Sequence, residues 1–197
     1  MQKSKQGIII TIARQHGSSG KEIGRLVAKK LGIPFYYKEV TVLAAKESGL
    51  DREFISDLNK NAPQLMHDLY LSNIVVHQAI IAQKKVIEKI AEQGSCVIVG
   101  RAADYVLKDA PNVVRVFIHA PLECRVGRVM EVYGDTREEA EKNIVRSDKA
   151  RAMYYKNISG LEWGDESNYE ILIDSSVGVR ESAERITEYL NRNIDSK

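Results

Sequence analysis

Short apolar runs rich in isoleucine, valine and phenylalanine alternate with longer segments of mixed polarity along this chain. Several of the runs are continuously apolar, which is typical of parallel strands that helices cover on both faces. The runs predict five strands, at residues 8–13, 33–36, 96–100, 113–118 and 169–173.

In the segments between these runs, apolar residues recur every three or four positions, which is the spacing of an amphipathic helix. The longest segment keeps this spacing over a row of apolar residues, Val76, Ala79, Ile80, Val86, Ile87 and Ile90, before a helix-ending Gly94. The pattern predicts helices at residues 21–31, 38–48, 52–60, 72–93, 101–108, 121–133, 136–155 and 179–193. Strands that alternate with helices in this way indicate a doubly wound α/β fold.

Two stretches interrupt the alternation. Residues 37–94 place about three helices between the second and third strands, and residues 131–168 place a charged helix and a loop before the last strand. Insertions beyond the carboxyl ends of strands are where substrate subdomains and lids lie in α/β proteins. We therefore expect one domain with a helical insertion, a lid and a core formed by residues of about 7–36, 95–130 and 169–195.

Composition narrows the classes of partner. The chain has 197 residues, 44% of them hydrophobic and 28% charged, which suits one globular domain. Its 29 basic and 27 acidic residues give a net charge of +2, so nothing attracts the whole molecule to nucleic acid or anionic lipid. An anion site must therefore be a local cluster.

Targeting signals and metal-ligand patterns are missing from the sequence. No apolar run approaches the ~20 residues of a membrane span, and the N-terminal MQKSKQG contains no apolar signal region. We expect a cytoplasmic protein without a membrane partner. Cys96 and Cys124 are isolated, so we expect no metal site built by the protein alone.

A glycine loop follows the first predicted strand: Gly17, Ser18, Ser19 and Gly20, then Lys21 and an amphipathic segment. The unpaired N–H groups of a first helical turn and the helix dipole attract an anion, and glycines let the backbone close around a phosphate. The order of these parts predicts a phosphate site. The alternative is an ordinary strand-to-helix turn with Lys21 at the surface.

The loop departs from the full phosphate-loop pattern at two positions. That pattern requires a glycine five residues before the Gly–Lys pair and a serine or threonine directly after the lysine. This chain has Gln15 and Glu22 there.

A second candidate follows the third predicted strand, where Gly100 precedes Arg101. In a parallel sheet this pair emerges at the same edge as the glycine loop, and an arginine there can clamp a phosphate with paired hydrogen bonds. Asp104 could orient the arginine or hold a sugar hydroxyl, and a helix cap is an equally open role.

A third candidate is the charged cluster Arg146, Asp148, Lys149 and Arg151. At helical spacing Asp148 and Arg151 share a face, although a charged helix face is often only solvated. Phosphoryl transfer needs several cations that come together as the site closes, and this cluster could supply them.

Further residues have open roles. Arg125 and Arg128 follow a strand and could face the site or solvent, and His16 within the loop is expected to face solvent. Trp163 could stack on a base or pack in a small local core.

Six segments in order resemble the cytidylate kinase-like family, a branch of the P-loop nucleoside monophosphate kinases. They are RQHGSSGKEIG, LGIPFYYKEV, VIVGRAADYVL, VFIHAPLECRVGRVME, SDKARAMYYK and WGDESNYEILIDSS, spread over about residues 7–190. The resemblance implies a five-stranded parallel sheet of the P-loop NTPase type, a helical nucleotide-binding insertion and an arginine-bearing lid. It also implies transfer of the ATP γ-phosphoryl group to a nucleoside monophosphate, which is CMP or dCMP in the best-known relatives.

The resemblance assigns roles to the candidates. The loop from Gly17 to Lys21, with Ser18, Ser19 and Gly20, would hold the ATP β and γ phosphates, with Glu22 beside them either near Mg²⁺ or pointing outward. The Mg²⁺ ion is held largely by water and ATP oxygens in such kinases. The implied catalytic residues are Lys21, Arg101, Arg146 and Arg151, and the implied acceptor-binding residues are Arg101, Asp104, Asp148 and Arg151.

Two further positions matter for the acceptor and the adenine. Tyr37 stands where many relatives have aspartate, so one polar group is missing from the acceptor side. The triplet Asp174-Ser175-Ser176 resembles the family's turn near the adenine, although it could simply cap the last helix.

The altered loop leaves two other functions open. One is a nucleotide-binding module without catalysis, and the other is a kinase with a different small-molecule acceptor. In each case the expected partners are small molecules, and the base, the sugar and the oligomeric state stay open.

Overall fold

The computed structural model of the protein describes residues 7–58 and 73–194. Within these residues, five strands form one sheet in the order β2-β3-β1-β4-β5, and every pairing is parallel. The strands are β1 (Ile9–Arg14), β2 (Phe35–Tyr36), β3 (Cys96–Val99), β4 (Val113–His119) and β5 (Ile171–Asp174). The central strand is β1, whose Ile9 lies opposite Cys96 on one side and Val113 on the other.

The helices follow the predicted order. They are α1 (Gly20–Leu31), α2 (Glu39–Ser48), α3 (Arg52–Leu58), α5 (Asn73–Glu92), α6 (Ala103–Val106), α7 (Leu122–Tyr133), α8 (Arg137–Ser159) and α9 (Val179–Ile194). Two 3₁₀ turns, η1 (Glu166–Asn168) and η2 (Ser175–Val177), flank β5. The predicted helical residues 59, 60 and 72 lie outside the described residues.

Helix α8 is longer than the sequence predicts. It begins with a capping box in which Thr136 and Glu139 bond each other's backbone N–H groups, and it passes residue 155 to end at Ser159. Gly160 then adopts a φ of 72° and donates its N–H to the carbonyl of Lys156. A left-handed glycine is a common helix stop, so the end of α8 is set by this residue.

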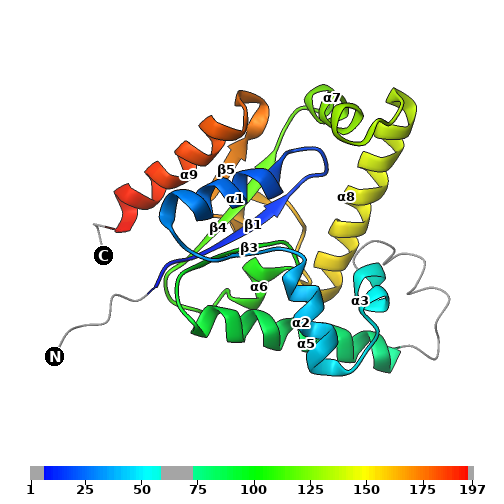
Figure 1. Ribbon diagram of the computed structural model, residues 1–197, viewed down its shortest axis with the longest axis vertical. Coiled ribbons are helices and arrows are strands. Elements are labelled where there is room, and N and C mark those ends of the chain that lie inside the picture. Colours follow the sequence, from blue (N-terminus) through cyan, green and yellow to red (C-terminus); the bar gives the residue numbers. More distant parts are fainter. Residues whose placement is uncertain (1–6, 59–72, 195–197) are drawn as a thin grey trace.

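Helices cover both faces of the sheet, as the continuously apolar strands predict (Figure 1). On one face, buried residues of α1 and α9 pack on the central strands, among them Val27, Ile186 and Leu190. On the other face lie α5 and α6, where Ile87 and Ile90 pack against Ile98. Helix α5, placed by the sequence in the insertion, thus contributes to the core.

The carboxyl ends of the strands point toward a second group of helices, α2, α3, α7 and α8 (Figure 1). Helices α7 and α8 share a small core of their own, formed by Val126, Val129, Ala140 and Ile144. This edge, where the glycine loop also lies, is the usual ligand side of a doubly wound sheet. In the described part of the chain, no helix is long and apolar enough to cross a membrane.

Candidate active site

A cavity of about 260 Å³ opens at the carboxyl ends of β1 and β3. Its walls come from the ends of these strands, from α2 and α3, and from α8 and the loop after it. Among the described residues, the lining contains the basic side chains of Arg14, Lys38, Arg52, Arg101 and Arg151, but only one acidic side chain, that of Asp104. This imbalance of charge suits an anionic ligand.

The glycine loop lies beside this cavity and has the geometry of an anion site. Gly17 has a φ of 77°, and Ser19, which precedes α1, has a φ of 55° and makes no side-chain cap. The first-turn N–H groups of α1 are therefore left for a ligand. A Cβ on Gly17 would lie 2.7 Å from the carbonyl oxygen of Arg125, so the loop could not take this path with a larger residue.

The unusual residues of the loop have separate explanations. Gln15 accepts a hydrogen bond from the N–H of Ala120 at 3.2 Å, so its side chain ties the loop to the end of β4. Glu22 is exposed in the first turn of α1, and Lys21 points its ammonium toward Tyr37, 5.7 Å from the centre of the ring. His16 is half-buried and stacks on Tyr133, whereas the sequence favours a solvent-facing side chain.

Asp148 fastens α8 to the loop. Its carboxylate accepts hydrogen bonds from the N–H of His16 at 2.7 Å, from Arg125 at 2.6 Å and from Arg151 at 3.3 Å. Arg125 is only 9% exposed and also donates to the carbonyls of Ala120 and His16. Asp148 is not among the residues that line the cavity, and the structure places it between the loop and Arg151, which does line it.

Arg101 and Arg151 both enter the cavity, as the sequence predicts for a shared site. Arg101 has a left-handed φ of 61°, rare for a residue with a side chain, and donates to the hydroxyl of Thr41 at 2.7 Å. Arg151 donates to the main-chain carbonyl of Arg14 at 3.0 Å. Burial, and next the positive charge of Arg14, lower the pKa of Arg151 to about 10. An anion bound in the cavity would stabilise the charged guanidinium and raise its pKa again.

Arg14 and Tyr37 are two of the cavity residues that sequence reasoning missed or undervalued. Arg14 is the last residue of β1, and its guanidinium lies 5.6 Å from the centre of the Tyr37 ring. Burial alone would raise the pKa of Tyr37, but the charge and hydrogen bond of Arg14, with the charge of Arg151, lower it overall. A basic residue at the carboxyl end of a strand, directly before a phosphate loop, was the available signal.

Asp104 is 3% exposed and reaches the cavity from α6. Its Oδ2 atom has no hydrogen-bond partner among the described residues. Burial raises the pKa of this carboxyl, and a hydrogen bond from Tyr155 opposes the rise in part. A carboxylate oxygen accepts hydrogen bonds, and the neutral carboxyl can also donate one, so this buried group has unused hydrogen-bonding capacity.

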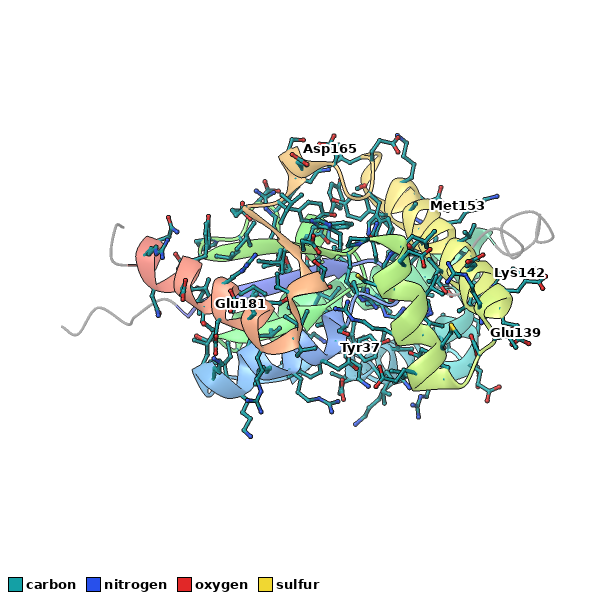
Figure 2. The ribbon with its side chains drawn as sticks, turned by 90° about the horizontal axis from the view of Figure 1, so that it is seen from above. Tyr37, Glu139, Lys142, Met153, Asp165 and Glu181 are labelled. Carbon is teal, nitrogen blue, oxygen red and sulfur yellow. The ribbon has the colours of Figure 1, made fainter. Side chains whose placement is uncertain are left out.

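Figure 2 shows the labelled Tyr37 near the middle of the molecule, and Glu139 and Lys142 on the outer side of α8. Arg146 belongs to this outer side, because it is exposed and donates to Asn143 at 3.0 Å. It does not line the cavity, and Lys149 is exposed as well. The structure thus brings Arg151 to the site and leaves the other two basic residues of the cluster outside it.

The remaining candidates mainly make hydrogen bonds and packing contacts within the protein. Arg128 donates to both the hydroxyl and the carbonyl of Ser175, and Asp174 caps η2 by accepting the N–H of Ser176 at 2.9 Å. Trp163 packs edge-on against Phe117 with 5.3 Å between ring centres, and it also lines the cavity. Both roles considered for Trp163 are therefore sterically available.

Comparisons with known proteins agree with this geometry. The model of the cytidylate kinase-like family matches residues 9–177. A curated cytidylate kinase from Methanopyrus kandleri is 28% identical over 178 residues, which cover 86% of this chain and 85% of the relative.

Solved structures show the same fold. An uncharacterized protein from Eubacterium ventriosum is 30% identical with a TM-score of 0.71, and the match covers 96% of this chain and 99% of that one. A shikimate kinase from Bacteroides thetaiotaomicron shares the fold at 13% identity and a TM-score of 0.57, over 93% of this chain and 98% of that one.

Proposed function

This chain belongs to the cytidylate kinase-like family and is a phosphotransferase with the P-loop kinase fold, and we propose that CMP or dCMP is its acceptor. The donor in this proposal is ATP with Mg²⁺. The reaction transfers the γ-phosphoryl group of ATP to the phosphate of the nucleoside monophosphate and releases ADP.

One observation carries the proposal: Arg14, Arg101 and Arg151 converge on a single cavity next to the glycine loop. The pKa values of Arg101 and Arg151 are lowered, first by burial and also by the charge of Arg14. Cations removed from water in this way favour a bound anion, and an acceptor phosphate supplies one.

In the proposed reaction the protein acts by position and charge. The loop N–H groups and Lys21 hold the donor phosphates, and Arg101 and Arg151 hold the acceptor phosphate so that the attacking oxygen lies in line. Asp148 and the carbonyl of Arg14 fix Arg151 by hydrogen bonds at 3.3 and 3.0 Å. The side chains contribute little covalent chemistry to this reaction.

The residues present fit a magnesium ion that arrives with ATP. In the described part of the chain, no three His, Cys, Asp or Glu side chains form a group that could hold a metal. In the proposed reaction phosphate oxygens and water would provide most of its ligands, as Mg²⁺ prefers. The ion would supply charge to the phosphates during transfer.

Asp104 is the proposed contact to the acceptor nucleoside. The residue lines the cavity and its Oδ2 is buried without a hydrogen-bond partner among the described residues, which supports a contact with a hydroxyl or amino group of the acceptor. A buried polar atom left unpaired destabilises a complex, so this atom favours acceptors that carry a donor at the right place.

The test is an acceptor screen. Purified protein with ATP and Mg²⁺ is given CMP, dCMP, UMP, AMP or GMP, and ADP release is followed. We expect the highest kcat/KM with CMP or dCMP, and a fall of about 10²–10³-fold in turnover for Lys21→Ala or Arg151→Ala, the scale of losing one preorganised donor of charge.

Lys142→Ala provides a matched control, because this lysine on α8 is exposed and pairs with the exposed Glu138. It should turn over like the wild type. ADP release that no acceptor stimulates would contradict the proposal. ATP-dependent stabilisation without turnover would instead support a nucleotide-binding module.

A further inference from the structure

Arg14 takes a path that only two glycines allow. A Cβ on Gly20 would lie 2.6 Å from the Cβ of Arg14, and a Cβ on Gly100 would lie 2.2 Å from its Nη1. These glycines begin α1 and follow β3. The arginine stem therefore passes from the glycine loop to the turn that holds Arg101, and its guanidinium sits between them.

The surroundings of this guanidinium join the two halves of the site. It lies 5.6 Å from the centre of the Tyr37 ring, and the ammonium of Lys21 lies 5.7 Å from the same centre. On its other side it lines the cavity together with Arg101 and Arg151. Arg14 is thus near both the donor-side lysine and the acceptor-side arginines.

Arg14 differs from a structural arginine in its partners. Arg125, for example, pairs with the carboxylate of Asp148 at 2.6 Å. Over residues 7–58 and 73–194, by contrast, no ion pair joins Arg14 to a carboxylate. The positive charges of Arg14, Arg101 and Arg151 repel each other around the cavity. Apolar side chains at these positions would stabilise the folded protein more. The binding of an anionic ligand therefore explains these three arginines better than packing does.

We propose that Arg14 is a catalytic residue, whose guanidinium bridges the ATP γ-phosphoryl group and the acceptor phosphate during transfer. The inference rests on the proposed kinase function. In the step, the bond from the γ-phosphorus to the β–γ bridging oxygen breaks, and a bond to an acceptor phosphate oxygen forms. The electron pair of the broken bond stays on ADP, and Arg14 keeps its protons and only donates hydrogen bonds.

The position on β1 has a mechanistic consequence. Arg14 belongs to the central strand, so its backbone position does not depend on the movement of a lid. A donor that is already oriented needs no reorganisation when charge spreads over the moving phosphoryl group. Its largest effect should therefore fall on kcat.

The experiment compares Arg14→Met, which keeps the stem without the charge, and Arg14→Lys, which keeps the charge without the planar fork. Arg25→Met is a matched control, because Arg25 also lies 5.6 Å from an aromatic ring, that of Phe35, but is exposed on α1. For each variant we measure kcat, the KM for ATP and for the acceptor, and the Tm without ligand.

For Arg14→Met we expect kcat to fall about 10²–10³-fold, with both KM values within about threefold of the wild type. Arg14→Lys should recover part of the loss, and Arg25→Met should match the wild type. The Tm of Arg14→Met should be equal to or above that of the wild type, since like-charge repulsion is removed.

Four results would overturn the assignment. Arg14→Met with normal kcat and a lowered Tm would make Arg14 a structural residue, and a rise in acceptor KM alone would make it a binding residue. A wild type that phosphorylates no acceptor would overturn the proposed function and the role of Arg14 with it. An active wild type with an equally active Arg14→Met would overturn the role of Arg14 alone.

Discussion

At the scale of single residues, the site combines charges that the fold keeps away from water. Asp104 is the acidic member, and it is 3% exposed with one oxygen unpaired. Burial raises its pKa above the ordinary value of 3.8, which means that folding favours the neutral carboxyl. The ionisation of Asp104 at higher pH should therefore lower the free energy of unfolding.

The sign of this effect can be tested with Asp104→Asn, which removes the titration and keeps the shape. Below the ordinary carboxyl pKa both proteins are neutral at this position, so their free energies of unfolding should differ least. As the pH rises through the raised pKa, the wild type should lose stability relative to the variant. Urea unfolding of both proteins from about pH 3 to about pH 9 measures this difference.

Asp165→Asn is the control for that series. Asp165 is exposed, and hydrogen bonds from the backbone and the hydroxyl of Ser167 lower its pKa below 3.8. Its difference from the wild type should stay flat above about pH 5. A flat difference for Asp104→Asn as well would mean that its carboxyl titrates normally in the folded protein.

At the scale of elements, one contact decides how α8 meets the core. Asp148 joins α8 to the loop after β1 and to Arg125 on α7. This carboxylate and the guanidinium are largely buried, with side chains 18% and 11% exposed. The lid predicted from the sequence is thus docked on the loop by a partly buried ion pair.

Asp148→Ala should destabilise the protein by about 3 kcal/mol, because it leaves the guanidinium of Arg125 buried without its carboxylate. Urea unfolding gives the free energy. Glu138→Ala is the matched control on the same helix, since Glu138 is exposed and pairs with the exposed Lys142. It should cause no measurable change, as exposed pairs contribute little. Equal stability of the two variants would show that Asp148 is not needed for docking.

At the scale of the whole molecule, segments from most of the chain form the cavity. The fluorescence of a tryptophan in its wall can report the binding of a ligand. Trp163 is the one tryptophan of the sequence, it lines the cavity, and it packs on Phe117 of β4. A ligand in the cavity must change the surroundings of this indole ring.

Titration with CMP should therefore change the fluorescence of Trp163 in a saturable way, even without ATP. Arg101→Met should weaken the response at least about tenfold, because it removes a charged contact to the acceptor phosphate. Arg185→Met, on α9 and paired with Glu181, is the control and should respond like the wild type. Heat of binding in calorimetry without any fluorescence change would place the acceptor elsewhere.

The sequence determined the parts of this protein that depend on neighbouring residues. Strand and helix positions, the parallel α/β fold and the glycine loop were predicted because side-chain periodicity and glycine conformations act over a few residues. Arg101 was predicted to lie beside the glycine loop, since parallel strands end at one edge of the sheet, and the family resemblance added Arg151 to the same site. Both line the cavity.

Only the tertiary structure decided which charges meet. Asp148 bonds the backbone of His16 across 132 residues, Arg146 on the same helix points to solvent, and Arg14 passes between two glycines from different segments. Such contacts depend on the rotation of a helix and on the space beside a backbone. Helical spacing shows which residues share a face but does not show what that face touches, so long-range packing made these choices.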